Sequence, residues 1–375
     1  MSNKLKLGFI GGGINSAVGR THKIAAEMDS RFEVVCGAFS RHADVNTKTG
    51  YEYGITPERV YNSWVDLLQK EKGKIDAVVI LTPTPTHTEI IIEAIKQGYP
   101  VICEKALTNS LLDANEIAKV VESHNGFLAV TYNYTGYPMV RELKHMIKNG
   151  VLGKIQQVHI EMPQEGFLRI TPDGKAQIPQ QWRLEDGEIP TVSLDLGVHL
   201  HNMVDFLIAE KPIRLVALQN NYGNFSGIID NVQCIAEYTN NVTCNFWYGK
   251  TALGQSNGLK VRIFGEKGSV EWLQLHPEEF VYCDNMGNRH KIDKGSASLQ
   301  VASQERYSRF KAGHPAGFIE AFANYYCDIV SSLTEYKTNK KQNSDLIFTV
   351  YDACESLNLT HAIQKSDLDK TWIKC

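Results

Sequence analysis

The sequence predicts an α/β protein of two domains: a doubly wound parallel sheet over residues 1–133, then an α+β domain with a large, mostly antiparallel sheet over residues 134–375. A chain of 375 residues with 43% hydrophobic content exceeds the usual size of one hydrophobic core. Short apolar runs alternate with helical patterns in the first third, whereas runs of period two dominate after residue 135. This change of pattern places the boundary near residue 133.

Composition argues against several kinds of partner. The 39 Lys and Arg residues against 42 Asp and Glu residues give a formal net charge of −3, without a run of one sign, so we expect neither nucleic acid nor a membrane surface. No stretch reaches the about 20 apolar residues that span a bilayer. The eight cysteines contain no CxxC pair and no secretory run opens the chain, which favours reduced thiols and a cytoplasmic protein.

The first domain is predicted from apolar runs that suit strands covered on both faces, with segments between them long enough for crossover helices. The runs are residues 4–10, 32–39, 77–82, 100–103 and 127–133. One predicted crossover helix, over residues 86–98, ends at Gly98. Another, over residues 110–126, begins with Ser110 and Asp113 at the spacing of a helix cap.

The second domain begins with a helical pattern over residues 137–150 and continues with alternating runs that predict an antiparallel sheet. These runs are residues 155–162, 230–251 and 259–273. The pair Asn240-Asn241 predicts a hairpin turn. Helical periodicity returns over residues 314–335 and 345–364.

The segment LGFIGGGINSAVG follows the first predicted strand. Gly11 permits a tight turn, and Gly13 lets the backbone approach a pyrophosphate at the N-terminus of the next helix. Ser16 stands where a third glycine is expected. As the first turn of a βαβ series, the segment predicts a Rossmann-type dinucleotide site lined by Gly11, Gly13, Ile14 and Asn15. An ordinary glycine turn is the alternative.

The end of the second predicted strand bears on the choice between NAD and NADP. An NAD site normally carries a carboxylate there for the ribose 2′-hydroxyl. This strand ends in Ser40 and Arg41, and no carboxylate follows before Asp44. A guanidinium and a hydroxyl suit a 2′-phosphate, which slightly favours NADP within an NAD(P) site. A surface arginine after a strand is the alternative.

The loop LTPTPTH follows the predicted strand at 77–82. Its prolines, beginning with Pro83, hold the backbone extended, so that it can lie beside a ligand with Thr82 and His87 at its flanks. His87 either contacts the cofactor or has a structural role at the start of the next helix, and the sequence leaves both open.

The segment VICEK ends a predicted strand on two opposite charges, Glu104 and Lys105. The carboxyl ends of the strands border the crevice in which doubly wound folds bind ligands, so both residues are candidates for cofactor contact. Successive strand residues point to opposite faces, so we expect one to serve the fold and the other the ligand. A solvated strand end is the alternative.

In the second domain, SLDLGVHLHNM places Asp195 and His199 at i and i+4, on one face if the segment is helical. Histidine is the natural general base for an alcohol proton, and a carboxylate can orient a polyol and support the imidazolium. A structural histidine facing a carboxylate is the alternative. His201 and Asn202 add polar groups, but without further ligands this spacing does not indicate a metal, and none is expected.

Together these pieces resemble the glucose-fructose oxidoreductase and inositol dehydrogenase family (Gfo/Idh/MocA) over nearly the whole chain. They occur in the family's order: GFIGGG, TPTPTH, EK at 104–105, YNYTGYPMVRELKHMIKNGVLGKI, QQWR at 180–183 and DLGVH at 195–199. The resemblance implies that Lys105 is the active-site lysine and that Asp195 and His199 are catalytic. It also implies that Trp182 and Arg183 lie near the nicotinamide.

Three positions depart from the family's pattern: Ala106 replaces the proline after EK, Thr84 replaces an asparagine, and Thr135 replaces an arginine. The first two concern cofactor geometry and the third the charge on the substrate side. GHPAGFIEAFANYY at 313–326 resembles a segment of a branch that acts on sugars or anhydrosugars. The candidate substrate contacts are Tyr134, His201, Asn202 and His314.

The sequence thus predicts an NAD(P)-dependent oxidoreductase that transfers a hydride between a secondary alcohol of a sugar, sugar derivative or cyclitol and the nicotinamide. His199 would take the alcohol proton and Lys105 would hold the oxygen, in a site between the domains. The alternatives are an NAD-dependent glycosidase without net redox change and a non-catalytic cofactor-sensing protein. Trp247, Tyr248 and Trp272, on or near the second sheet, indicate a self-association face of a homodimer or homotetramer.

Overall fold

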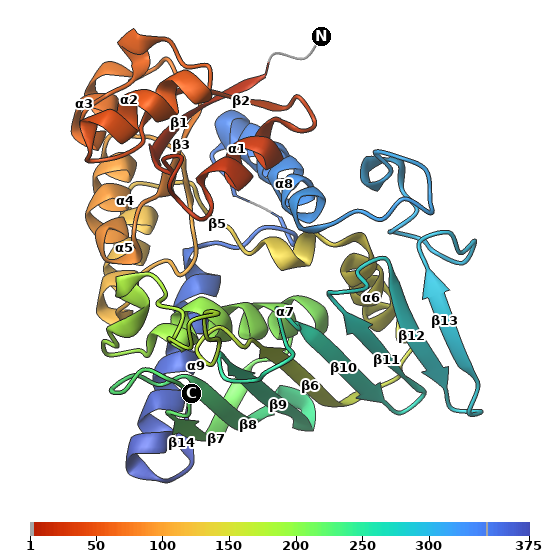
Figure 1. Ribbon diagram of the computed structural model, residues 1–375. Coiled ribbons are helices and arrows are strands. Elements are labelled where there is room, and N and C mark those ends of the chain that lie inside the picture. Colours follow the sequence, from red (N-terminus) through yellow and green to blue (C-terminus); the bar gives the residue numbers. More distant parts are fainter. Residues whose placement is uncertain (1–3, 343) are drawn as a thin grey trace. The chain divides into compact units, whose positions relative to one another are not determined.

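The computed structural model describes residues 4–342 and 344–375, and the chain forms two compact units (Figure 1). The first unit combines the N-terminal residues up to Gly136 with Phe318–Cys354. The second combines Tyr137–Gly317 with Glu355–Cys375. The predicted boundary at residue 133 lies close to the end of the first segment, whereas residues 318–354, expected in the second domain, belong to the first unit.

The first unit contains the predicted parallel sheet. Its five strands lie in the order β2-β1-β3-β4-β5, and neighbouring strands are parallel. The strands are β1 (Leu5–Gly11), β2 (Phe32–Ala38), β3 (Ala77–Leu81), β4 (Val101–Cys103) and β5 (Leu128–Val130). Every residue of β3, the central strand, is buried. The strand order reverses between β1 and β3, which is where doubly wound sheets bind ligands.

The helices of the first unit are α1 (Gly19–Glu27), α2 (Ala43–Glu52), α3 (Trp64–Lys70), α4 (His87–Lys96), α5 (Leu111–Ser123) and α8 (Phe318–Asn339). The Ser110 side chain accepts a hydrogen bond from the Asp113 N–H and caps α5 as predicted. Helix α8 comes from the late part of the chain and packs against α1. There the ring of His22 meets Phe322 edge-on, with 4.5 Å between the ring centroids.

The second unit contains a nine-stranded sheet in the order β13-β12-β11-β10-β6-β9-β8-β7-β14. The strands are β6 (Ile155–Pro163), β7 (Pro212–Asn220), β8 (Asn231–Tyr238), β9 (Val242–Gly249), β10 (Lys260–Gly265), β11 (Gly268–Leu273), β12 (Glu279–Asp284), β13 (Arg289–Asp293) and β14 (Ile373–Lys374). Strands β6 and β9 pair in parallel, and the other ladders between these strands are antiparallel. The mostly antiparallel sheet predicted for this part of the chain is confirmed.

The turn between β8 and β9 is the one predicted at Asn240-Asn241. Both asparagines adopt the left-handed conformation, with φ of 56° and 63°, which asparagine tolerates better than most residues. Along β8 and β9, buried residues alternate with more exposed ones, so one face of the sheet belongs to the core.

Helices α6 (Pro138–Lys148) and α7 (Val198–Ile208) and the part of α9 (Val350–Asp369) beyond Cys354 belong to the second unit. Helix α7 packs on β6. Tyr248 and Trp272, predicted at a self-association face, are fully buried instead. The period-two pattern identifies which residues share a face, but it does not say which face meets the core. Trp247, on the opposite face, remains partly exposed.

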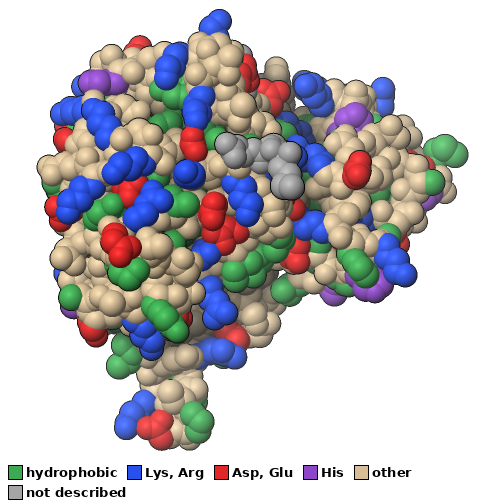
Figure 2. Space-filling view, turned by 90° about the horizontal axis from the view of Figure 1, so that it is seen from above, with side chains coloured by type: hydrophobic (Ala, Val, Ile, Leu, Met, Phe, Trp, Pro, Cys, Tyr) green, Lys and Arg blue, Asp and Glu red, His purple; other side chains and the backbone are tan. Residues whose placement is uncertain are grey.

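Acidic and basic side chains intermix over the face of the molecule seen in Figure 2, in keeping with the near balance of charges in the sequence. Among residues 4–342 and 344–375, no helix has the length and apolar content needed to cross a membrane.

Candidate active site

The carboxyl edge of the first sheet gathers residues that follow three neighbouring strands. Thr82 follows β3, Lys105 follows β4, and Thr131 follows β5. Backbone hydrogen bonds tie neighbouring strand ends together: the Glu104 N–H donates to the Ile80 carbonyl at 3.0 Å, and the Thr131 N–H donates to the Cys103 carbonyl at 3.0 Å. Parallel strands therefore bring Thr82, Lys105 and Thr131 to one edge.

The glycine turn after β1 closes tightly on β3. Gly11 has φ of +83°, and a Cβ at this position would lie 2.7 Å from the Leu81 carbonyl oxygen and the Thr82 nitrogen. A side chain is excluded there by both conformation and space. The predicted role of Gly11, a tight turn that brings the backbone close to its neighbours, agrees with this geometry.

The role of the third glycine of the dinucleotide fingerprint belongs to Gly19, and not to position 16, where the sequence has a serine. A Cβ on Gly19 would lie 2.0 Å from the Gly12 carbonyl oxygen, so this glycine permits close packing of helix and strand. The turn is longer than the fingerprint assumes, because α1 begins only at Gly19. Ser16 has a different role: its hydroxyl accepts hydrogen bonds from the N–H groups of Val18 and Gly19 at the start of α1.

The glycine turn also approaches the end of β2. A Cβ on Gly13 would lie 3.1 Å from the Phe39 carbonyl oxygen, and the Ile14 N–H donates to the Thr49 hydroxyl at 3.1 Å. The Ser40 hydroxyl accepts a hydrogen bond from the His42 N–H at 3.1 Å. Asn15 and Arg41 are exposed. Ser40 and Arg41 thus follow the strand beside the glycine turn.

Thr82 carries a polar atom that the protein itself does not satisfy. Its hydroxyl oxygen is buried and has no hydrogen-bond partner among the residues that the structure describes. Such atoms are rare in folded proteins, and an absent ligand is one common explanation. Together with the glycine turn, this orphan hydroxyl fits a dinucleotide at this edge. Pro83, which follows directly, precedes the short 3₁₀ turn η2 (Thr84–Thr86) and is exposed.

His87 is buried at the start of α4, with both ring nitrogens facing backbone carbonyls. Nε2 lies 2.8 Å from the Thr82 oxygen, and Nδ1 lies 3.0 Å from the Leu107 oxygen. Burial lowers the pKa of this imidazole, although the two carbonyls oppose the effect. His87 therefore braces the loops after β3 and β4. Its direct contact with a cofactor remains a prediction.

Glu104 is held by groups of the first unit, and the division of roles between Glu104 and Lys105 remains a prediction. The Glu104 carboxylate accepts hydrogen bonds from His22 Nε2 at 2.9 Å and from the Thr131 hydroxyl at 2.6 Å. Burial alone would raise the pKa of Glu104, but the bond and charge of His22, the charge of Lys105 and the bond from Thr131 together lower it. Lys105 is half-buried, and its peptide bond to Ala106 is cis.

In the second unit, Asp195 lies in a π-helical turn, Ser193–Gly197, that leads directly into α7. Such turns occur frequently at functional sites. A Cβ on Gly197 would lie 2.9 Å from the ring and hydroxyl of Tyr248, which explains the glycine within DLGVH. The Tyr248 hydroxyl in turn lies 2.8 Å from the Ser193 hydroxyl.

Two cations meet the carboxylate of Asp195. Lys250 Nζ donates to Asp195 Oδ2 at 2.7 Å, and Arg183 Nη1 donates to the same oxygen. The Arg183 guanidinium also lies over the Trp182 ring, 4.4 Å from its centroid. Trp182 is 44% exposed. Asp195 is thus an acceptor held in place by two cations, and the QWR segment is joined to DLGVH through the ion pair with Arg183.

The sequence interpretation missed Lys250. It follows β9 directly, and its side chain is 8% exposed. Besides Asp195, its ammonium bonds the Gln164 amide oxygen at 3.1 Å and lies 5.7 Å from the centroid of the Phe167 ring. A lysine at the end of an alternating run reads as a solvated strand end, and only the tertiary contacts show that it is buried.

His199 and His201 both lie on α7. His199 is buried on the first turn of α7. His201 is 1% exposed, its Nδ1 lies 3.3 Å from the Tyr238 hydroxyl, and burial lowers its pKa to about 4. Asn202 is buried beside it in sequence. Burial places the His201 imidazole in the core of the second unit. Contacts of His201 and Asn202 with a substrate remain predictions.

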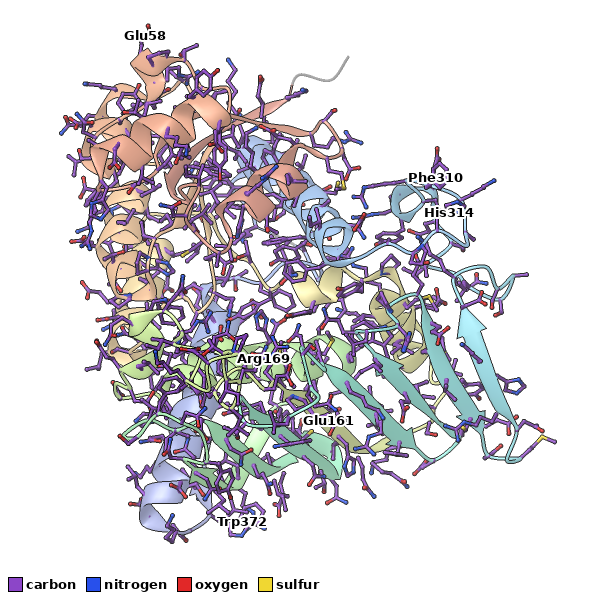
Figure 3. The ribbon with its side chains drawn as sticks, in the orientation of Figure 1. Glu58, Glu161, Arg169, Phe310, His314 and Trp372 are labelled. Atoms are coloured by element: carbon purple, nitrogen blue, oxygen red, sulfur yellow. The ribbon has the colours of Figure 1, made fainter. Side chains whose placement is uncertain are left out.

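Two further candidates lie in different environments. Tyr134 is buried in the first unit and meets Phe318 edge-on, with 5.9 Å between ring centroids. His314 is exposed in the second unit and packs against Phe310 at 4.7 Å, as the labelled side chains in Figure 3 indicate. Asn133, which the sequence interpretation did not single out, is buried after β5 with its Nδ2 unbonded among the described residues.

No group of three or more His, Cys, Asp or Glu side chains within residues 4–342 and 344–375 could hold a metal ion.

Models of known families match both parts of the chain. Residues 5–132 match the oxidoreductase family with an NAD-binding Rossmann fold, and residues 140–271 match the GFO/IDH/MocA C-terminal domain. The oxidoreductase YfiI of Bacillus subtilis is 27% identical over 100% of this chain and 98% of its own length.

Solved structures agree over the full length. The crystal structure of an oxidoreductase from Sinorhizobium meliloti is 30% identical, with a TM-score of 0.86 and complete coverage of both chains. An inositol dehydrogenase homolog from Azotobacter vinelandii, complexed with NADH and myo-inositol, is 24% identical. It has a TM-score of 0.90 and covers 100% of this chain and 98% of its own.

Proposed function

From the premise that this chain belongs to the Gfo/Idh/MocA oxidoreductase family, we propose that it transfers a hydride between a secondary alcohol of a sugar, sugar derivative or cyclitol and a nicotinamide dinucleotide. The observation that carries the proposal is the position of Lys105. Lys105 follows β4 at the same sheet edge as the glycine turn and the orphan hydroxyl of Thr82. An alcohol bound by this lysine would lie within reach of a dinucleotide held at that edge.

The residues of the first unit suit the cofactor as follows. Gly11 and Gly13 let the backbone approach the pyrophosphate, and Thr82 would donate to the cofactor or accept from it. Ser40 and Arg41 follow β2, where a ribose would lie, and they would favour a 2′-phosphate. A bound nicotinamide supplies a carbon that accepts or returns the hydride. By the family resemblance, Trp182 and Arg183 of the second unit would meet the nicotinamide end.

The proton and the developing charge are handled by two side chains. His199 accepts the alcohol proton as the carbon–hydrogen bond breaks, and it returns the proton in the reverse direction. Lys105 donates a hydrogen bond to the alcohol oxygen and stabilises the negative charge that develops there. The proposal needs both groups, since one removes the proton and the other lowers the energy of the charged oxygen.

Asp195 acts as a fixed acceptor in this scheme. Two cations, Arg183 and Lys250, hold its carboxylate in place, and we assign the role of the base to His199. With Gln164, which bonds Lys250, the cluster offers both donors and acceptors. A ring that carries several hydroxyl groups is the ligand that such a mixture recognises best.

The named activities of relatives support this substrate class. The myo-inositol 2-dehydrogenase of Thermotoga maritima is 23% identical over 84% of this chain, and levoglucosan dehydrogenase with NADH and levoglucosan has a TM-score of 0.83. Both names describe ring polyols or anhydrosugars. We propose this class of substrate for the present chain, without naming a single compound.

A screen of sugars, anhydrosugars and cyclitols with NAD and NADP tests the proposal by following the absorbance of the reduced nicotinamide. At least one ring alcohol should give stoichiometric reduced cofactor and a ketone. Reducing sugar released from a glycoside without reduced cofactor would indicate the redox-neutral glycosidase. Tight cofactor binding without turnover of any compound would favour the cofactor-sensing protein.

We propose, further, that the protein forms a homodimer or homotetramer through the face of the second sheet that faces away from the core. Leu218, Ile235 and Phe264 are exposed there by 48%, 46% and 37%, and cross-strand pairing places Trp247 on the same face. Apolar groups on an open sheet favour self-association. Light scattering should give two or four chains, and Ile235→Lys should shift the mass toward one.

A further inference from the structure

His22 joins three segments of the first unit that are distant in sequence. It lies on α1, its side chain is 0% exposed, and both ring nitrogens have polar partners. Nε2 lies 2.9 Å from Glu104 Oε1 after β4, and Nδ1 lies 2.7 Å from the Tyr326 hydroxyl on α8. Phe322, also on α8, packs against the rings of both His22 and Tyr326.

The directions of these hydrogen bonds are mutually consistent. Nε2–H donates to Glu104 whether the ring is neutral or protonated. Nδ1 accepts the proton of the Tyr326 hydroxyl in the neutral ring and donates to that hydroxyl in the protonated ring. The Thr131 hydroxyl donates to the same carboxylate oxygen at 2.6 Å. Glu104 thus accepts two hydrogen bonds, from His22 and from Thr131, and this matches a carboxylate whose pKa is lowered.

The cluster lies between two parts of the proposed site. Helix α1 begins at Gly19, the glycine that packs against Gly12, and His22 lies on the first turn of that helix. Glu104 immediately precedes Lys105. The imidazole thus connects the start of the cofactor-binding helix to the strand end that carries the lysine, and the chain of bonds continues to Thr131 after the neighbouring strand β5.

A buried network of this kind is not needed for stability alone, since apolar groups of similar volume often stabilise a core equally well. A fully satisfied network does, however, allow only one arrangement of the groups it joins. The geometry of a reacting group matters strongly, because a displacement of about 1 Å can lower a rate by about 10²-fold.

We propose that His22 is a positioning residue: through Glu104 it fixes the strand end that bears Lys105 relative to the glycine turn, and Tyr326 sets the orientation of its ring. This inference rests on the proposed function, because it assumes that Lys105 binds the substrate alcohol. The positions of His22, Glu104 and Tyr326 do not depend on it.

Kinetics of two His22 variants give the first test. His22→Ala should lower kcat by about 10- to 100-fold, with the Kd of the cofactor and the KM of the alcohol within about threefold, because the loss is in placement rather than in binding. His22→Gln keeps an amide donor that can reach Glu104, so it should recover most of kcat. A kcat within twofold of wild type for His22→Ala would overturn the proposal, as would equal losses in the two variants.

Two adjacent tyrosines of α8 provide a matched control. Tyr325 and Tyr326 are both buried, but the Tyr325 hydroxyl donates to the Val130 carbonyl and does not meet His22. Tyr326→Phe should lower kcat severalfold, and Tyr325→Phe should leave it within twofold even if both lower Tm. If the two variants lose kcat alike, the effect is general loosening of the core and the proposal fails. This comparison also decides the matter if His22→Ala does not fold.

Hydrogen exchange separates this inference from the proposed function. His22→Ala should exchange faster than wild type in the segments 103–108 and 130–133, with the remaining strands of the sheet unchanged. If no alcohol is turned over, the proposed function fails, but faster exchange confined to these segments would still support the role of His22 in holding the strand end. Unchanged exchange there would overturn it whatever the activity.

Discussion

Lys250 and Asp195 form a nearly buried ion pair, with Nζ and Oδ2 2.7 Å apart and side chains only 8% and 12% exposed. Arg183 meets the same carboxylate oxygen. One carboxylate is thus held by two cations in surroundings where an unpaired charge would be costly. The pair joins the strand end after β9 to the π-helical turn before α7, and so connects the second sheet to the segment that carries His199.

Lys250→Met should destabilise the second unit, because it removes the nearly buried ammonium that bonds both Asp195 and Gln164. Breaking such a pair on one side typically lowers the free energy of unfolding by about 3 kcal/mol. Arg183 still bonds Asp195 in this variant, so the loss of unfolding free energy should lie near the low end of the range that is usual for broken buried ion pairs. Denaturant unfolding followed by circular dichroism measures it.

A double-mutant cycle with Asp195→Asn isolates the ion pair. If the two residues stabilise the protein through each other, the coupling free energy should exceed about 1 kcal/mol. Additive losses in the two single variants would mean that Lys250 contributes through the packing of its aliphatic chain alone.

His199→Ala should remove the acid limb of the pH profile of kcat/KM for alcohol oxidation, because the proposed base is then absent. His201→Gln is the matched control, since His201 lies two residues further along α7 and its pKa, lowered to about 4 by burial, is far from the working range. The limb should persist in the control. Persistence of the same limb in His199→Ala would assign the base to another group.

The buried neutral state of His201 should make the protein less stable in acid. Burial lowers its folded-state pKa from 6.5 to about 4, so the unfolded chain binds more protons between these values and stability falls as the pH falls through this window. The contribution is fully present above about pH 6.5 and amounts to about 3 kcal/mol.

Replacing the histidine tests this acid sensitivity. His201→Gln should flatten the dependence of the unfolding free energy on pH between about 6.5 and 4, without abolishing it, because burial also lowers the pKa of His87. An unchanged slope in the variant would show that other groups cause the loss.

Arg41→Ala should raise the Kd of NADP more than that of NAD. An arginine that pairs with a 2′-phosphate typically contributes about 1.5–3 kcal/mol, and its exposure here should reduce this. Arg31→Ala is a matched control, since Arg31 is also exposed but precedes β2, at the opposite end of the same strand. Equal losses for the two cofactors in Arg41→Ala would return the preference to NAD.

The sequence carries most of the information on the fold where a pattern is local. The apolar runs predict β1 to β5 because strands buried on both faces need no polar residues. Ser110 predicts a helix cap because its hydroxyl can accept a backbone N–H, and Asn240-Asn241 predict a turn because asparagine tolerates the left-handed conformation. The position of residues 318–354 in the first unit could not be predicted from a local pattern. It depends on the packing of α8 against α1, which no periodicity within either helix reveals.

The candidate site also contains residues that a local pattern predicts and residues that it does not. Lys105, Asp195 and His199 can be proposed from the sequence because they end or interrupt apolar patterns with polar groups. His22 and Lys250 are missed because each looks ordinary in sequence, and their partners lie 82 and 55 residues away. Gly19 is missed because the turn that it completes is longer than the motif assumes. Contacts of this range arise only from the assembled fold.

The most direct test of the account is deuterium transfer from a ring alcohol labelled at the reacting carbon. Wild-type protein with oxidised cofactor should release reduced nicotinamide that carries the deuterium, detected by mass spectrometry. Lys105→Met should bind the cofactor almost as wild type does and transfer the label slower by a factor on the order of 10² or more, because a contact made in the transition state is lost. Label that never reaches the nicotinamide, or a wild-type rate of transfer in Lys105→Met, would contradict the account.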